Sequence, residues 1–379
     1  MQLCAGFSYI TDKEIYMKIG IVGCGSIART YLPNINCMFS NIEIAGVCDL
    51  VREKVEKRAE VHNVGKIYSD MYEIFNDPEV DIVLNITRPN DHYEVTKAAL
   101  LAGKHVYSEK PLATDLEKAK ELVELAKSKN LYLGGAPDTF MGAGIQTARK
   151  LIDDGEIGKV IGANVFFLGH GPEDWHPDPE FFYKRGGGPM LDMGPYYVTT
   201  LVNLIGRVNS VMAYGGISYP KRTITSEPHK GEVVDVEVDT FTTGALRFDN
   251  GAVVSLTVSF DSYTDRNEYI EIYGETGTIR VPDPNFFGGA VYINRMGKGF
   301  EPVDLVEGFT KDSRAIGLSD MADAIENKRL HRANYMQQLH VLEIMLAFEK
   351  SSRANTAVAI ESPFERQPMV DPKAVKGEY

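Results

Sequence analysis

Three polar side chains that can exchange a proton stand at the ends of expected elements. Lys110 closes the segment 105–110, while Asp192 and Tyr196 follow the glycine run 186–188. Residues four apart share one helix face, so Asp192 and Tyr196 are expected to project together. A lysine, a carboxylate and a phenol can orient an alcohol and take its proton. From spacing alone, a solvated lysine, a carboxylate at a helix N-terminus and a packed tyrosine remain alternative interpretations.

A glycine loop near the start of the chain carries a second kind of chemistry. Gly23-Cys24-Gly25-Ser26-Ile27-Ala28 has the pattern G-x-G-x-x-A between an expected strand and an expected helix. Gly23 permits a tight turn, Gly25 lets the backbone approach a pyrophosphate, and Ala28 permits close helix packing. In this context the pattern predicts a dinucleotide site. A purely structural turn is the alternative.

Asp49 closes the next expected strand, 24 residues after Gly25. A carboxylate at that position accepts hydrogen bonds from an adenosine ribose and repels a 2′-phosphate. The sequence therefore favours NAD over NADP as the cofactor. Arg52, one helical turn further on, is expected to lie over the adenine or to offset part of that repulsion.

The only tryptophan lies beside a histidine in the proline-containing loop 171–179, which includes Asp174, Trp175 and His176. An indole can stack on the face of a sugar, and a neighbouring imidazole can accept a proton. This combination is typical of a carbohydrate site. A loop anchored by a buried tryptophan is the alternative.

Strands and helices alternate along the first third of the chain. The expected strands cover 18–23, 42–49, 81–87 and 105–110, and the expected helices cover 51–62, 93–102 and 116–126. This alternation predicts an α/β Rossmann domain with a doubly wound parallel sheet. Lys110 would then lie at the carboxyl edge of the sheet, where such folds bind ligands.

The pattern changes near residue 135. Helices are expected over 142–154 and 190–204, then β-like segments at 210–218, 236–248, 252–260, 268–273, 278–281 and 290–294, and final helices at 318–327 and 336–351. This order predicts an α+β domain with one large open, mostly antiparallel sheet. The expected organisation is an N-terminal extension (1–16), a Rossmann NAD-binding domain (17–136), a second domain (137–360) and a C-terminal tail (361–379).

Composition narrows the class of partner. The 379 residues carry a net charge of −13, which disfavours nucleic acid. A hydrophobic share of 44% and a charged share of 25% are typical of a soluble globular chain. No stretch approaches the roughly 18 apolar residues of a membrane span. The cysteines Cys4, Cys24, Cys37 and Cys48 lack metal-ligand or disulfide spacing, so we expect no metal site and a reducing cytoplasm.

Jointly, these motifs resemble the Gfo/Idh/MocA family of nicotinamide-dependent sugar and polyol oxidoreductases over about residues 17–361. The resemblance is carried by the glycine loop, Glu109-Lys110-Pro111, Asp192-x-Gly194 and the segments 87–92, 102–106 and 274–278. It implies an open-sheet second domain that binds substrate and packs subunits into homo-oligomers, and it places Lys110 near the nicotinamide and the reacting hydroxyl. With the glycine loop, the implied cofactor-binding residues are Gly23, Gly25, Ser26, Ile27, Ala28, Asp49, Arg52, Thr87, Pro89, Asn90, His92, Glu109 and Lys110.

The chain departs from the family at the residue expected to take the proton. The usual motif is D-x-G-x-H, and Tyr196 stands at the histidine position. A free tyrosine has a pKa of about 10 and is a poor base at neutral pH, although a neighbouring ammonium lowers that pKa. We expect Lys110, oriented by Asp192, to take the proton together with Tyr196. His176 is the alternative base.

Within the family, the segments 136–140, 175–177 and 192–197 resemble a subgroup of glucoside 3-dehydrogenases that act on O- or C-linked glucosides. The resemblance implies NAD-dependent oxidation to a 3-keto glucoside. A ketone at C3 acidifies the C2 proton, so a partner lyase can then eliminate the C1 substituent. Inositol or polyol oxidation, exchange between two sugars on retained NAD, and a non-catalytic NAD-dependent sugar sensor are the alternatives.

Overall fold

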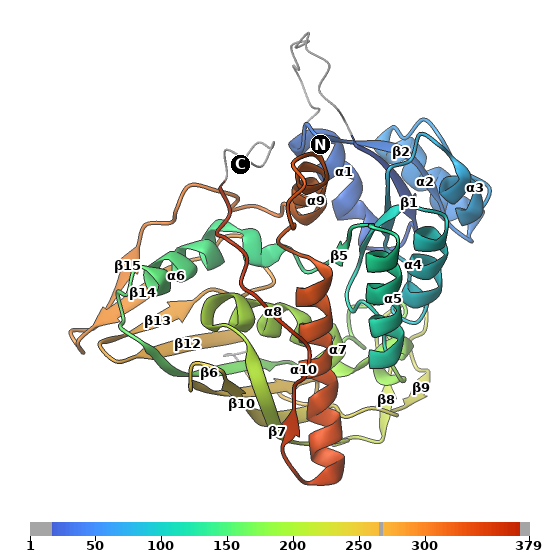
Figure 1. Ribbon diagram of the computed structural model, residues 1–379. Coiled ribbons are helices and arrows are strands. Elements are labelled where there is room, and N and C mark those ends of the chain that lie inside the picture. The colour runs from blue at the N-terminus through green and yellow to red at the C-terminus, as the bar shows by residue number, and fades with distance from the viewer. Residues whose placement is uncertain (1–16, 265–267, 372–379) are drawn as a thin grey trace.

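The structure is a computed structural model that describes residues 17–264 and 268–371. The expected N-terminal extension (1–16), with Cys4, and the end of the expected tail (372–379) lie outside the described residues. A five-stranded sheet and a nine-stranded sheet form the framework, with a two-stranded hairpin beside them (Figure 1). No described helix combines the length and the apolar character needed to cross a membrane.

The five-stranded sheet is parallel throughout, in the order β2-β1-β3-β4-β5. Its strands are β1 (Met17–Val22), β2 (Ile42–Cys48), β3 (Ile82–Asn85), β4 (His105–Ser108) and β5 (Leu133–Gly135). The accompanying helices are α1 (Ala28–Met38), α2 (Arg52–His62), α3 (Met71–Asn76), α4 (His92–Leu101) and α5 (Leu116–Ser128). All four residues of the central strand β3 are buried, as expected where helices cover both faces. The predicted doubly wound sheet is confirmed.

The nine-stranded sheet has the order β15-β14-β13-β12-β6-β11-β10-β7-β16. Its strands are β6 (Val160–Leu168), β7 (Val208–Gly216), β10 (Phe241–Phe248), β11 (Val253–Ser259), β12 (Glu268–Gly274), β13 (Gly277–Val281), β14 (Val291–Arg295), β15 (Phe300–Val303) and β16 (Val358–Ala359). Its neighbouring strands pair antiparallel, apart from β6 and β11, which are parallel. The predicted large, mostly antiparallel sheet is confirmed.

Helices cover one face of this larger sheet (Figure 1). They are α6 (Ala143–Asp153), α8 (Gly194–Ile205) and α10 (Tyr335–Ala354), and every residue of α8 is buried. Strand side chains alternate between faces, and the uncovered face exposes Met212, Tyr214 and Val253 among others. The sheet therefore has one packed face and one open face.

The single helix predicted over 190–204 is instead two helices. α7 (Gly188–Asp192) ends at Asp192, Met193 lies between, and α8 begins at Gly194. Pro195 has no backbone N–H and is favoured in the first turn of a helix, so a new helix starts there. Asp192 and Tyr196 consequently come from consecutive helices and not from one helix face.

The last third of the chain returns to the Rossmann domain. The Tyr132 hydroxyl donates to the carbonyl of Ala324 in α9 (Ile316–Glu326) at 3.1 Å, and Asn41 exchanges hydrogen bonds with Ser319. This segment, expected in the second domain, thus packs on the first. The short elements β8 (Lys221–Thr223), β9 (Val233–Asp235), η1 (Thr139–Met141) and η2 (Glu180–Tyr183) complete the described fold.

Candidate active site

Lys110 and Asp192 form an ion pair between the two domains. Lys110 lies just after β4, and its Nζ donates to Asp192 Oδ1 at 2.7 Å and to the Asp192 carbonyl at 2.6 Å. The two side chains are 15% and 23% exposed. Burial lowers the pKa of Lys110, but the Asp192 carboxylate outweighs burial and the pKa is raised overall. Lys110 is therefore a fixed cation and hydrogen-bond donor at neutral pH.

Tyr196 lies beside this pair in the first turn of α8. Lys110 Nζ is 5.3 Å from the centre of the Tyr196 ring, within the range of a cation–π contact. Burial raises the pKa of the Tyr196 phenol, while Lys110 and Arg314 act to lower it. Lys110 lowers the pKa of the phenol, as expected, but burial raises that pKa by more. In the free protein Tyr196 is a neutral hydroxyl at neutral pH.

His176, the alternative base, is half-buried among aromatic rings. Its Nδ1 accepts the backbone N–H of Asp178 at 3.0 Å, so the neutral ring carries its proton on Nε2. Phe181 and Phe182 meet the imidazole edge-on. Burial lowers the pKa of His176. The ring is therefore neutral at neutral pH. Its unprotonated nitrogen, Nδ1, already accepts a hydrogen bond from the backbone and is not available to take a substrate proton.

Trp175 is 66% exposed, so it does not anchor its loop by burial. Its ring lies edge-on to His176, 5.4 Å between centres. The loop is anchored instead by Glu173, whose buried carboxylate accepts from Arg222 at 2.6 Å and from the Tyr183 hydroxyl. Asp174, next to Trp175, is exposed. The anchored loop leaves the indole free to contact another molecule.

The glycine loop has the geometry that its pattern predicts. Gly23 has φ +108°, and a Cβ there would lie 2.6 Å from the Ile86 carbonyl oxygen, so only glycine fits. A Cβ on Gly25 would meet nothing within 4 Å. Ala28 is fully buried at the start of α1. The open space over Gly25 at a helix N-terminus fits a pyrophosphate.

Asp49 is held over this loop by two backbone donors. Its Oδ2 accepts from Cys24 N at 2.7 Å, and its Oδ1 accepts from Val51 N at 2.8 Å. The carboxylate keeps free lone pairs, as a ribose site requires. Arg52 forms an ion pair with Glu56 at 2.6 Å, so its charge is already partly balanced. The residues present therefore fit NAD.

His92 and Glu109, two of the implied cofactor residues, hydrogen-bond to the backbone of the neighbouring loops. His92 is fully buried, with Nδ1 2.7 Å from the Pro111 carbonyl and Nε2 3.1 Å from the Thr87 carbonyl. Glu109 accepts from the Tyr31 hydroxyl at 2.9 Å and from Lys110 N at 3.0 Å. Both side chains fix the backbone around Lys110.

The remaining implied residues lie on the loop that follows β3. Thr87 donates its hydroxyl to Asn85 at 2.7 Å. Pro89 is half-buried and Asn90 is exposed. A Cβ on Gly186 would lie 2.7 Å from Asn90 Oδ1, so the glycine run of the second domain reaches this loop. The structure thus brings the loop that contains Asn90, which the resemblance assigns to the cofactor, next to the glycine run that precedes α7.

Sequence reasoning missed Arg314, which lies just before α9. Its guanidinium donates to Asn285 Oδ1 at 2.8 Å and forms an ion pair with Asp312 at 2.8 Å, and its charge acts to lower the pKa of the Tyr196 phenol. Asp138, buried after β5, accepts from Ala315 N and Gly317 N at 3.0 Å each. Arg314 stands in no spacing pattern that marks chemistry. Asp138 lies in the segment 136–140, which carried the subgroup resemblance without giving Asp138 a role.

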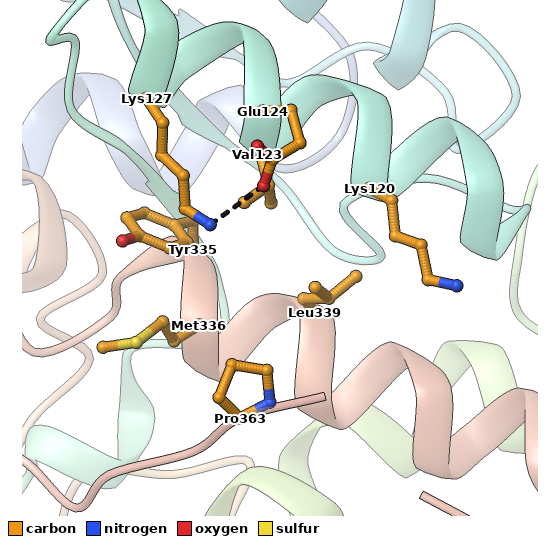
Figure 2. A pocket seen from close by; sticks show the side chains of 8 residues that line it. All are labelled: Lys120, Val123, Glu124, Lys127, Tyr335, Met336, Leu339 and Pro363. Carbon is orange, nitrogen blue, oxygen red and sulfur yellow. Dashed lines mark hydrogen bonds and ion pairs between the residues drawn. The ribbon is translucent and has the colours of Figure 1, made fainter. Parts of the chain in front are cut away.

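The described residues contain no group of three or more histidine, cysteine, aspartate or glutamate side chains placed to hold a metal ion. A separate small pocket of about 130 Å³ lies between α5 and α10 (Figure 2). Lys120, Lys127, Tyr335 and Leu339 are among the side chains that line it. None of its lining residues belongs to the Lys110 cluster.

Two family models match the chain in succession. Residues 17–134 match the oxidoreductase family with an NAD-binding Rossmann fold, and residues 145–280 match the GFO/IDH/MocA C-terminal domain. Both matches agree with the two sheets described above.

Several characterised proteins are similar in sequence. D-xylose dehydrogenase of Paenarthrobacter nicotinovorans is 32% identical over 45% of this chain and 45% of its own length. Levoglucosan dehydrogenase of Pseudarthrobacter phenanthrenivorans is 32% identical over 56% of this chain and 57% of its own. The chain thus spans about half the length of these two relatives in the matches. Myo-inositol 2-dehydrogenase of Thermotoga maritima is 27% identical over 69% of this chain and 74% of its own length.

Solved structures share the fold. The apo form of levoglucosan dehydrogenase superposes with a TM-score of 0.81 at 22% identity, covering 92% of this chain and 100% of that chain. An NAD-binding oxidoreductase from Klebsiella pneumoniae gives a TM-score of 0.80 at 21% identity, with the same coverage.

Asp49 generates a prediction about cofactor choice. Replacing Asp49 with serine removes the charge that we expect to bind ribose and to repel a 2′-phosphate. The affinity for NADH should fall about tenfold, the cost of losing one charged hydrogen bond, while the affinity for NADPH should rise. Fluorescence titration with each reduced nucleotide measures both without any substrate. Asp49→Asn, which keeps the shape, should lie between, and an unchanged NADH preference in the serine variant would contradict this role.

Proposed function

Because the chain belongs to the Gfo/Idh/MocA family of oxidoreductases, we propose that it transfers hydride between NAD and a secondary hydroxyl of a sugar or glycoside. The observation that carries this proposal is the Lys110–Asp192 pair at the carboxyl edge of the Rossmann sheet, on the same edge as the glycine loop. The relatives named as D-xylose, myo-inositol and levoglucosan dehydrogenases support a sugar or polyol substrate.

The residues of the pair have distinct parts in the proposed reaction. Bound NAD supplies the acceptor for the hydride and its two electrons. Oxidation removes a hydride from the carbinol carbon and a proton from its oxygen, which leaves a carbonyl. Lys110 donates a hydrogen bond to that oxygen while Asp192 keeps the ammonium aimed. Tyr196 exchanges the proton together with Lys110.

The protonation states of the free protein favour one role for these groups at neutral pH. Asp192 keeps the pKa of Lys110 raised, and burial keeps the pKa of Tyr196 raised. Both groups are then donors that stabilise a developing alkoxide and protonate it when a carbonyl is reduced. Oxidation needs one of them to lose its proton first, so it becomes faster as the pH rises.

For the substrate we propose C3 of an O- or C-linked glucoside, giving a 3-keto glucoside. The exposed indole of Trp175 beside His176 supports a sugar face or an aromatic aglycone in this loop. The keto product is the substrate that a downstream lyase would need. Inositol or another polyol is the second candidate, favoured by the inositol dehydrogenase among the relatives.

We also propose that the protein acts as a cytoplasmic homo-oligomer. The open face of the nine-stranded sheet exposes Ile161, Met212, Tyr214, Phe241 and Val253, which together form an apolar surface suited to a second copy. Cys24 and Cys48 are free thiols, which fits a reducing compartment.

A substrate panel tests the proposed function. Purified protein is incubated with NAD and an O-glucoside, a C-glucoside, free glucose or myo-inositol. The expected product is a glucoside that has lost two hydrogens, with its new carbonyl placed at C3 by NMR. Lys110→Met is the matched control: it should still bind NADH but lose at least about a hundredfold in turnover, because the oxyanion loses its donor.

Other results of the panel have defined meanings. Oxidised inositol alone would contradict the glycoside substrate and keep the dehydrogenase. NAD binding with no oxidation of any compound would favour the sugar sensor. Turnover that survives exhaustive dialysis without added NAD would favour exchange between two sugars on a retained cofactor.

The raised pKa values of Lys110 and Tyr196 generate a pH prediction. Both groups lose their protons only above the neutral range, so kcat/KM for oxidation should climb about tenfold per pH unit from about pH 6 to about pH 9. Tyr196→Phe should lower it throughout, and His176→Ala should leave the slope unchanged. A plateau already reached near neutral pH, or full activity in Tyr196→Phe, would contradict the proposed pair and point to His176.

A further inference from the structure

We infer that Arg222 is a specificity-determining positioning residue. It fixes the loop that carries Trp175 and His176, so that the exposed indole is a preformed platform for a flat ring of the bound glycoside. This inference rests on the proposed function, in which this loop receives part of the substrate. Arg222 lies in β8, 49 residues after Glu173 in the sequence, and its side chain is only 5% exposed.

A small hydrophobic core of its own supports the Trp175 loop. Its buried members come from η2, from the hairpin of β8 and β9 and from the end of β11, and they are Phe182, Tyr183, Ile224, Val234, Val236 and Phe260. The His176 ring meets Phe182 edge-on, and the centre of the Trp175 ring is 6.5 Å from that of Phe182. The loop and the hairpin therefore form one packed unit within the second domain.

Arg222 joins the parts of this unit through its guanidinium. One terminal nitrogen donates to the His170 carbonyl at 2.9 Å and to Glu173 Oε1 at 2.6 Å. The other donates to the Phe260 carbonyl at 2.8 Å and binds the Asp261 carboxylate. The start of the loop is thus tied to the end of β11 by one side chain. A lysine keeps the charge but has a single nitrogen, so it cannot serve these four acceptors in the same geometry.

The backbone of the loop is fixed on both sides of Trp175. The Glu173 carbonyl accepts the N–H groups of Thr225 and Ser226, between β8 and β9, at 2.8 Å and 3.0 Å. The Ser226 hydroxyl donates to the His176 carbonyl at 2.6 Å. The indole between these two anchors is 66% exposed. An exposed ring on a fixed backbone binds another ring without the entropic cost of ordering the loop.

The same loop borders the reaction site. Asp178, near its end, forms an ion pair at 2.7 Å with Arg88, on the loop that follows β3. A Cβ on Gly187 would lie 2.5 Å from the Phe181 carbonyl oxygen, so η2 lies directly against the start of α7. Helix α7 ends at Asp192. The platform therefore lies beside the elements that hold the ion pair, where the rest of a bound glycoside would extend.

The test uses Trp175, the only tryptophan of the chain, as a reporter. In ligand-free Arg222→Lys, the fluorescence anisotropy of the indole should fall because the loop is no longer fixed. Titration with phenyl glucoside, followed by indole emission, should give a Kd at least about tenfold above that of wild type, since binding must now order the loop. With methyl glucoside, an equal loss identifies the sugar as the stacked ring, and a smaller loss identifies the aglycone; either supports the inference.

Kinetics add a readout that general damage to the fold would not reproduce. In Arg222→Lys, KM for the glucoside should rise by the same factor as Kd. The affinity for NADH should stay unchanged and kcat should stay within about twofold of wild type, because Lys110 and Asp192 lie on other elements. Binding is measured without turnover, so a wild type that binds glucosides and oxidises none would count against the proposed function alone.

The matched control is Arg332→Lys, which makes the same change at another ion pair. Arg332 is 13% exposed, lies between α9 and α10, and pairs with the fully buried Asp320. It should leave the anisotropy and the glucoside Kd as in wild type. Ser226→Ala, which removes the bond to the His176 carbonyl, should act in the direction of Arg222→Lys and decides if that variant does not fold. Equal anisotropy and Kd in Arg222→Lys and Arg332→Lys, or a wild-type indole that responds to no glucoside, would overturn the inference.

Discussion

The ion pair between Lys110 and Asp192 is the interaction on which the arrangement of the site depends. It joins the end of a Rossmann strand to the end of a short helix in the second domain. Removing two charges from water is costly, and the cost is offset only when the remaining hydrogen-bonding capacity is used. Here the ammonium meets both the carboxylate and the carbonyl of Asp192. Loss of either partner leaves the other charge unpaired in a largely buried place.

The surrounding fold supports this pair from both domains. Helix α1, which begins at the glycine loop, reaches Glu109 through Tyr31 and the Arg314 segment through Asn34. Helix α1 therefore links the glycine loop to Glu109 and to the backbone of Asp312 and Arg314. In the second domain, the hydrogen bonds of buried Glu173 with Arg222 and Tyr183 fix the loop that carries Trp175. The exposed ion pair of Arg88 with Asp178, at 2.7 Å, joins that loop to the Rossmann domain.

Much of the Rossmann half was predictable from local pattern. The glycine loop, Asp49 and the position of Lys110 at a strand end follow from short-range spacing, and the structure shows the expected backbone at each. Helix α3 was missed because its six residues are too few to show periodicity, although Asp70 caps it by accepting two backbone N–H groups. The hairpin of β8 and β9 was missed for a similar reason, since three-residue strands carry no alternation.

The part of the site that the second domain contributes was harder to predict from the sequence. Asp192 and Tyr196 both lie beside Lys110, as the family resemblance implied. The four-residue spacing predicted one shared helix face, which is wrong because a new helix starts at Gly194-Pro195. The exposure of Trp175 depends on Glu173, Arg222 and Tyr183, which lie apart in sequence. Arg314 depends on a turn imposed by Asp138 from the other side of the fold. Such long-range contacts have no counterpart in local spacing.

The most direct test of the central claim is a double-mutant cycle on the ion pair. The measurement is kcat/KM for wild type, Lys110→Met, Asp192→Asn and the double variant, on any sugar that the protein oxidises. If Asp192 acts by aiming Lys110, each single change should cost about a hundredfold or more, and the double change should cost no more than the worse single one. Losses that multiply, or an Asp192→Asn variant with wild-type turnover, would show that the two residues act independently and would contradict the account.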